Sequence, residues 1–276
     1  MSKLFMPKLA IALSVLLLSA GAQANPHSWW KPNPAPAPQP HSGYQAPASC
    51  LGCTHTGGNT QLKFVSTNTT VNTKVKIGGS SFSGKNIALG SYNLLEKATP
   101  SSLGTNLVGF CVDPYQSAKS NLHGYTKSTL DASDFVSNGL SQTTRFANAQ
   151  KLFDNAYAGL STIGTATQQA VNTAGFHLAL WEVFFDDNNL TTGGIKGMTG
   201  TNASVLTSAT SFLSQLASWR VKDAYQISFF KSICDQDFVT AKLKEINPPT
   251  TVPLPSALPL FLFAICGFGI MSRRRL

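Results

Sequence analysis

The stretch that decides the fold runs from Thr165 to Phe185 and has the sequence TATQQAVNTAGFHLALWEVFF. Apolar residues recur along it at the three- and four-residue intervals of one α-helical face. That face consists of Ala170, Ala174, Leu178, Trp181 and Phe185. Two Asp and two Asn residues then end the pattern, and they offer too few ligands at loop spacing for a calcium site. We therefore predict a helix over residues 165–185 with one buried stripe.

Two further helices and several strands flank this segment. Helical periodicity is present in Gln142–Tyr157 and in Ser204–Trp219. Period-two or buried-strand patterns are present in Gln61–Val65, Thr70–Ile77, Asn106–Asp113, Ala224–Phe230 and Phe238–Leu243. Strands come first, helices follow and strands return, an order that favours an α+β fold over repeated βαβ units.

The charge of the chain is concentrated at its ends. The 276 residues carry a net charge of +9, yet only 12% of them are charged, which is about half the usual share of a globular domain. Five of the 21 basic residues are terminal, namely Lys3, Lys8, Arg273, Arg274 and Arg275, whereas all 12 acidic residues lie between Glu96 and Glu245. Between the termini the excess of basic residues is small, so composition gives no support to nucleic-acid binding.

The N-terminus has the pattern of a secretory signal. Lys3 and Lys8 precede the apolar run Leu9–Leu18, and Ala22-Gln23-Ala24 supplies the small residues that signal peptidase requires. The apolar run is too short for a transmembrane anchor, which is the alternative. We therefore assign residues 1–24 to a signal peptide cleaved after Ala24.

Residues 25–59 form a Pro-rich leader that ends in a Cys-x-x-Cys motif. Proline fixes φ and removes hydrogen-bond donors, so we expect an extended spacer. Cys50 and Cys53 are candidates for a disulfide in an oxidising compartment. With His55 they would still lack the fourth ligand of a structural zinc site, so we expect no metal and no other cofactor.

The C-terminus has three features in a fixed order. Val252, Pro253, Leu254 and Pro255 come first, the apolar segment Ala257–Met271 follows, and three arginines close the chain. This arrangement resembles the VPLPA-type variant of PEP-CTERM sorting signals, with Ser256 in place of alanine. The resemblance implies processing by an exosortase after transient insertion into the inner membrane, with residues 248–276 as the signal. A simple tail anchor is the alternative, although the segment is short for a permanent span.

Three motifs between the ends resemble the thioester domains of bacterial surface proteins, in the form found in PEP-CTERM proteins. They are Phe110-Cys111-Val112-Asp113, Gly175–Val183 and Gln236-Asp237-Phe238-Val239. The resemblance implies a β-rich fold with a helical insertion over residues 60–247. In that family the cysteine sulfur is joined to the carbonyl carbon of a glutamine side chain, and the bond traps an amine of the target.

One departure from the family concerns its reactive glutamine. Cys111 matches the family's cysteine, but His177 occupies the glutamine position, and imidazole has no carbonyl to acylate. Gln168 and Gln169 lie roughly 12 to 14 Å earlier along the helix axis. We therefore expect a thioester-like domain without the bond, and a covalent thioester adhesin is the alternative.

Two other fates of Cys111 stay open. A cysteine facing a histidine is the minimal pair of a cysteine hydrolase, in which Asp113, Asn172 or Asp186 would orient the imidazole of His177. A disulfide between Cys111 and Cys234 would exclude both chemistries. We expect Cys111 and Cys234 to form this disulfide and the protein not to be an enzyme.

Together these features predict an exported structural or adhesive protein of the cell envelope, the outer surface or the extracellular matrix. Its expected partners are signal peptidase and an exosortase during export, followed by a polysaccharide or another surface molecule. By resemblance, such substrates belong to biofilm-forming, polysaccharide-producing bacteria.

Overall fold

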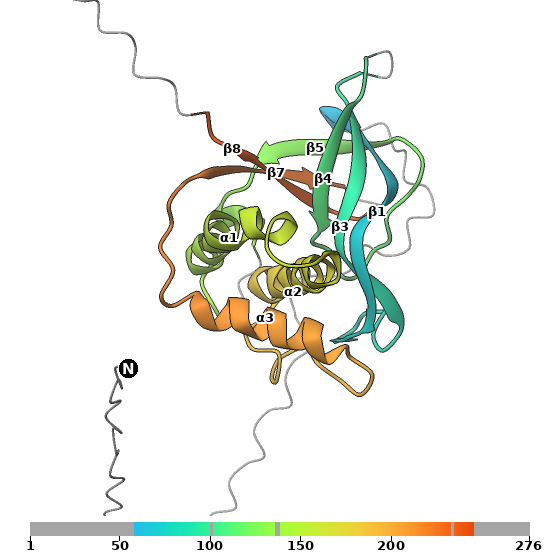
Figure 1. The fold of residues 1–276 in the computed structure, drawn as a ribbon. Helices are drawn as coiled ribbons and strands as arrows, with labels where there is room; N and C mark the ends of the chain where they lie inside the picture. Colours follow the sequence, from blue (N-terminus) through green and yellow to red (C-terminus); the bar gives the residue numbers. More distant parts are fainter. Residues whose placement is uncertain (1–57, 100–101, 136–138, 233–234, 246–276) are drawn as a thin grey trace, which may run out of the picture. The chain divides into compact units, whose positions relative to one another are not determined.

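A computed structural model describes residues 58–99, 102–135, 139–232 and 235–245 (Figure 1). The predicted signal peptide, the Pro-rich leader with Cys50 and Cys53, and the sorting signal lie outside these residues, as does Cys234. Among the residues described, no helix is both long and apolar enough to cross a membrane.

Six strands of the described residues close into an antiparallel barrel. Around the barrel they are β1 (Thr60–Lys74), β3 (Asn86–Lys97), β4 (Thr105–Cys111), β8 (Phe238–Leu243), β7 (Tyr225–Lys231) and β5 (His123–Thr129). Closure leaves no free sheet edge in the barrel. Two short strands, β2 (Lys76–Ile77) and β6 (Ile195–Lys196), form a separate pair.

The predicted strands Gln61–Val65 and Thr70–Ile77 have different bounds in the structure: β1 joins the first to residues 70–74 in one long strand, and Lys76–Ile77 form β2. The register of β1 with β3 shifts between Phe64 and Ser66 and again between Thr67 and Thr69. A register shift moves side chains from one face of a sheet to the other, so the two halves of β1 do not share one alternation. The sequence pattern broke at these irregularities although the strand continues.

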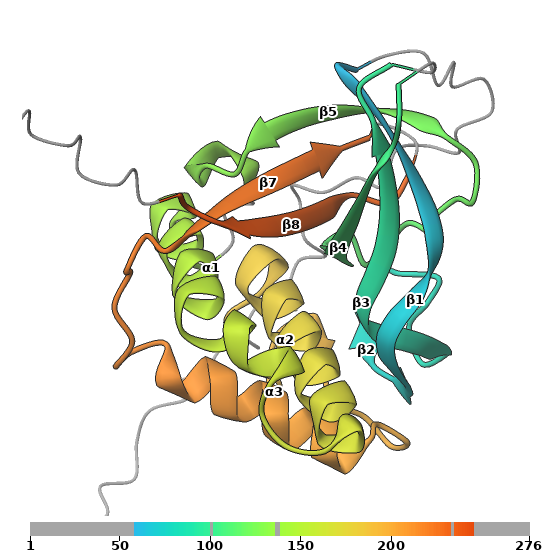
Figure 2. The same cartoon turned by 45° about the horizontal axis from the view of Figure 1, so that its top comes forward.

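Three α-helices are described: α1 (Gln142–Ala156), α2 (Ala166–Phe185) and α3 (Ala203–Gln215). Two short 3-10 helices, η1 (Ala132–Asp134) and η2 (Tyr157–Ser161), flank α1. Helix α2 packs against α1, α3, β1 and β3, and Figure 2 shows it between α3 and the β1–β3 hairpin. The fold is therefore mixed and rich in sheet, with the helices between β5 and β7 in the chain, as the predicted order of elements requires.

The burial of α2 differs from the predicted stripe. All twelve residues from Thr173 to Phe184 are buried, whereas Ala170 and Phe185 are only partly buried. A helix that is buried all round belongs to a core rather than to a surface layer. Gly175 permits this packing, because a Cβ there would lie 2.6 Å from the Ser208 side chain of α3.

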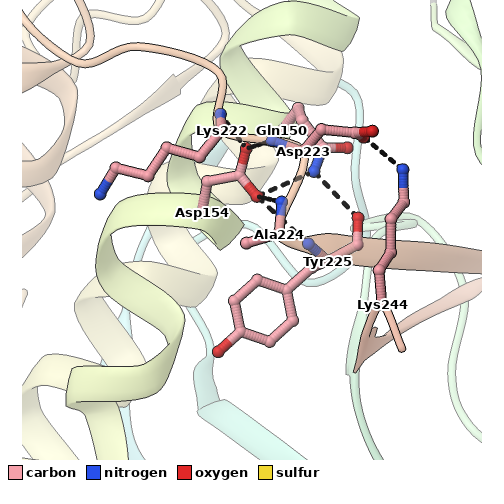
Figure 3. A network of polar contacts seen from close by, with 7 residues as sticks. All are labelled: Gln150, Asp154, Lys222, Asp223, Ala224, Tyr225 and Lys244. Carbon is pink, nitrogen blue, oxygen red and sulfur yellow. Dashed lines mark hydrogen bonds and ion pairs between the residues drawn. The ribbon is translucent and has the colours of Figure 1, made fainter. Parts of the chain in front are cut away.

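Polar side chains of α1 fix the ends of two neighbouring elements. Arg145 is fully buried and donates to the carbonyl oxygens of Glu182 and Val183 at the end of α2, at 3.4 and 2.9 Å. The carboxylate of Asp154 accepts four main-chain N–H bonds, at 2.8 to 3.3 Å, from residues 222–225 (Figure 3). Gln150 donates both to Asp154 and to a carbonyl of the same segment. These contacts satisfy main-chain groups at the start of β7 that would otherwise be buried without partners.

Candidate functional site

Cys111 and His177 lie in contact at the centre of the domain. Cys111 is the last residue of β4, and His177 stands in the buried part of α2. The Cys111 Sγ atom is 3.1 Å from His177 Nε2. The proximity predicted from the sequence, with the cysteine at a strand end and the histidine on the long helix, is therefore present.

The hydrogen bonds of the imidazole define its tautomer. The main-chain N–H of Gly90 donates to His177 Nδ1 at 2.9 Å, so Nδ1 carries the lone pair. Nε2 therefore carries the proton and donates to the carbonyl oxygen of Cys111 at 2.7 Å. Trp181 Nε1 donates to the same oxygen at 3.0 Å. The ring nitrogen that faces the sulfur consequently has no lone pair to accept the thiol proton.

A glycine is required where β3 meets this ring. Gly90 has φ 144°, and a Cβ built there would lie 1.9 Å from the carbonyl oxygen of Thr69 on β1. Any larger residue would move the strand and with it the N–H that holds the imidazole. This main-chain partner of His177 could not be predicted from the sequence.

Burial sets the ionisation of both members of the pair. It lowers the pKa of His177 to about 4, partly offset by the bond to the Cys111 carbonyl. Burial also raises the pKa of Cys111 to about 12; the hydrogen bond between the thiol and Tyr92 opposes the rise and Asp113 adds to it. Neutral thiol and neutral imidazole therefore coexist at neutral pH. This is the opposite of the lowered thiol pKa on which the hydrolase alternative depends.

The acidic and amide groups predicted to orient the imidazole bond elsewhere. Asp113 accepts from the Tyr115 N–H, Asn172 accepts from the side chains of Gln168 and Ser208, and Asp186 accepts from the Ile195 N–H. The orienting group is instead the main chain of Gly90.

Neither predicted substitute for the missing carboxamide reaches the sulfur. Gln168 and Gln169 lie in the first turn of α2, where their amides donate to Asn172 and to the carbonyl of Gly164. These bonds hold both side chains within the N-terminal part of the helix.

Cys111 is a free, buried cysteine. Its sulfur contacts His177 and the hydroxyl of Tyr92, 3.9 Å away, rather than the expected disulfide partner Cys234. Cys234 is outside the part of the chain that the structure describes.

A cavity of about 260 Å³ opens beside the sulfur. Its lining includes Tyr92, Cys111, Trp181 and Gln236, with Ile87 of β3 on its wall. Gln236 was part of the third sequence motif, but no role was predicted for it. Its amide donates to the Asp113 carbonyl at 2.5 Å, which fixes the segment before β8 against the end of β4. The cavity combines aromatic faces with an amide, the usual chemistry of a site for a small polar ligand.

No protein family and no curated protein matches this sequence. Among solved structures, the N-terminal domain of the Streptococcus pyogenes pilus tip adhesin Cpa is 13% identical, with a TM-score of 0.40 over 72% of this chain and 100% of that one. The N-terminal thioester domain of a Clostridium perfringens surface protein, in a cysteine-to-alanine mutant, is 10% identical, with a TM-score of 0.36 over 55% of this chain and 89% of that one. These scores are too low to support an argument about function.

Proposed function

We propose that this chain is an exported structural or adhesive protein of the cell surface or extracellular matrix, sorted by an exosortase, whose folded domain binds its target without a covalent bond and without catalysis. The observation that carries the proposal is the contact between Cys111 and His177. The sulfur faces an imidazole at the position where the resembled thioester domains have a carboxamide.

Two physical arguments support binding over chemistry. An internal thioester needs an acyl carbon beside the thiol, and the ring of His177 offers none. A cysteine nucleophile needs a thiolate and a base, whereas Nε2 is protonated and the pKa of Cys111 is about 12. What the site does offer is the cavity with Tyr92, Trp181 and Gln236.

We propose a polysaccharide as the target, because aromatic faces and amides are the groups that hold sugar rings and hydroxyls. The test is binding of the mature protein to the host's exopolysaccharide by isothermal calorimetry. Ile87→Trp fills the cavity and should abolish binding. The matched control is Val108→Trp in a second cavity of about 260 Å³ on the other side of β4, which should leave binding unchanged. Equal binding by both variants would refute this assignment of the site.

The export route is proposed from the terminal motifs. Signal peptidase would cleave after Ala24, and an exosortase would act at the Val252–Pro255 motif once Arg273–Arg275 has stopped translocation at the inner membrane. Deleting the host's exosortase should leave a longer, membrane-retained form. An unchanged size and location in that strain would instead indicate a simple tail anchor.

The intact mass of the mature protein, before and after methylamine, tests the absence of covalent chemistry. We expect a chain that begins at Asn25, with no loss of ammonia and no methylamine adduct. A mass lower by one ammonia, with methylamine incorporated at a glutamine, would replace this proposal with the covalent adhesin.

A further inference from the structure

Three carboxyl groups gather at the C-terminal end of α2. Oxygen atoms of Glu182, Asp186 and Asp187 all lie within 4.8 Å of one another. Glu182 and Asp186 are buried, with 0% and 3% of their surface exposed, whereas Asp187 is exposed. The cluster is therefore closed on the protein side and open to solvent on one side.

One oxygen of this cluster has no partner. Glu182 Oε2 accepts from the Asn189 N–H at 3.1 Å, but Glu182 Oε1 is buried and makes no hydrogen bond. The side-chain oxygen of Asn188, in the loop directly after the cluster, is also buried without a partner. Both atoms accept hydrogen bonds. A buried polar atom without a partner costs free energy, so the unpartnered oxygen of Glu182 within this cluster calls for a ligand that supplies positive charge.

The nearby positive charge does not balance the cluster. Arg145 interacts electrostatically with all three carboxyl groups, but its Nη1 atom donates to the carbonyls of Glu182 and Val183. One guanidinium faces three carboxyl groups, and the C-terminus of α2 adds its own partial negative charge. Burial, followed by Asp186 and Asp187, raises the pKa of Glu182 to about 9.

We propose that Glu182, Asp186 and Asp187 bind a calcium ion. The donor set consists of carboxylate oxygens, which select a hard divalent cation. The cluster comes from a helix end and the loop that follows it, and Ca²⁺ accepts such irregular geometry with water completing its shell, whereas Mg²⁺ demands a near-ideal octahedron. Exposed Asp187 provides the entry path.

The ion would fix a loop that already folds back on the helix end. The Asn189 N–H donates to both Glu182 and Asp187, and the Ile195 N–H of β6 donates to Asp186 at 2.6 Å. Since β6 pairs with β2, calcium would tie the end of α2 to this small sheet. Extracellular modules bind Ca²⁺ with dissociation constants of roughly 10⁻⁴ to 10⁻³ M, which defines the range to test.

The experiment measures thermal unfolding and calorimetric binding of the chelator-treated mature protein in CaCl₂, with MgCl₂ and KCl at matched ionic strength. We expect the unfolding temperature to rise with Ca²⁺ and not with KCl, with a weaker response to Mg²⁺. The absence of a Ca²⁺ response at millimolar concentration would overturn the proposal and leave the cluster as an ionic network with Arg145.

Two variants and a control locate the ion. Glu182→Gln preserves shape while removing the buried charge, so it should fold and lose the calcium response. Asp187→Asn changes an exposed residue and should weaken Ca²⁺ binding at least tenfold. Glu245→Gln removes an exposed carboxylate elsewhere and should bind as the parent does. If Glu182→Gln and Asp187→Asn both bind Ca²⁺ as tightly as the control, the ion sits elsewhere and this assignment is wrong.

Discussion

Alkylation of Cys111 in the folded protein distinguishes an inert buried thiol from a catalytic one. The reagent is iodoacetamide, which reacts with the thiolate and not with the thiol. Cys111 is 7% exposed, and its sulfur contacts the protonated nitrogen of His177. We expect the folded protein to resist labelling between pH 6 and 8 and to be labelled rapidly once unfolded.

The magnitude follows from the thiol pKa. Burial raises it from 9.0 to about 12, and each unit is a tenfold change in the thiolate fraction, so the thiolate at neutral pH falls about 1000-fold. Restricted access to the sulfur slows the reaction further. The labelling rate of folded Cys111 should therefore lie at least about three orders of magnitude below that of the unfolded chain.

The assay is peptide mapping by mass spectrometry over a time course, with the Cys111 peptide after urea unfolding as the reference. Tyr92→Phe serves as a second probe, since the Tyr92 hydroxyl bonds to the sulfur and lowers the thiol pKa. Its removal should not speed labelling. If folded Cys111 is labelled at mildly acidic pH as fast as in the unfolded chain or faster, the thiol is not inert. That result would contradict this prediction and favour the hydrolase alternative.

Three further predictions concern His177 and Asp154. Because His177 has a pKa of about 4 in the fold against 6.5 unfolded, the unfolded chain binds its proton first. The contribution of His177 to stability should therefore fall by up to about 3 kcal/mol as the pH drops from 6.5 to 4, measured by urea unfolding as the difference between the parent chain and His177→Gln; a difference that stays constant across this window would contradict this. His177→Gln removes that pH-dependent loss and supplies a carboxamide beside the Cys111 sulfur. The intact mass of this variant should be lower by one ammonia, and an unchanged mass would show that the scaffold cannot form a thioester. Asp154→Asn replaces the oxygens that accept four main-chain bonds and should cost about 2 to 4 kcal/mol of stability, in contrast to Asp223→Asn at the exposed end of the same network.

Long periodic elements were predictable from the sequence. The predicted helices agree with α1 and α2 within one residue at each end, and β8 has its predicted bounds. Helix α3 ends at Gln215, four residues before its predicted end at Trp219. In each of these elements the hydrophobic pattern repeats over at least two helical turns or two strand alternations. Such a pattern can be recognised from the local spacing of residues alone. The contact of Cys111 with His177 came from motif resemblance rather than from periodicity.

Two strands and the closure of the barrel were not predictable. Strand β3 contains Gly90, and most of its central residues are buried, so it shows no clean alternation; β5 is short and polar. Their partners lie far away in the chain, because β1 pairs with β5 and β4 with β8. Such pairing depends on packing between residues far apart in the chain, and local sequence patterns do not show which strands pair.

In the candidate site, too, the positions of the residues were predictable, whereas their hydrogen-bond partners and burial were not. Spacing placed His177 on the buried helix but could not give its protonation, because its partners are a main-chain N–H of β3 and a main-chain carbonyl of β4. Main-chain groups have no signature in the sequence. The acidic residues at the end of α2 were visible as i, i+4 and i+5 neighbours, but the burial of Glu182 and its unpartnered oxygen were not.

The role of His177 follows from these bonds. In one neutral tautomer it accepts from Gly90 of β3 and donates to Cys111 of β4, and so joins both strands to α2. An apolar residue of similar size would leave the buried N–H without a partner, at a cost of about 1–3 kcal/mol. A protonated imidazole would lose the lone pair that accepts from Gly90. The imidazole can therefore stabilise this core only while it is neutral, and a ring held neutral with its proton committed to a carbonyl cannot also serve as the base of Cys111.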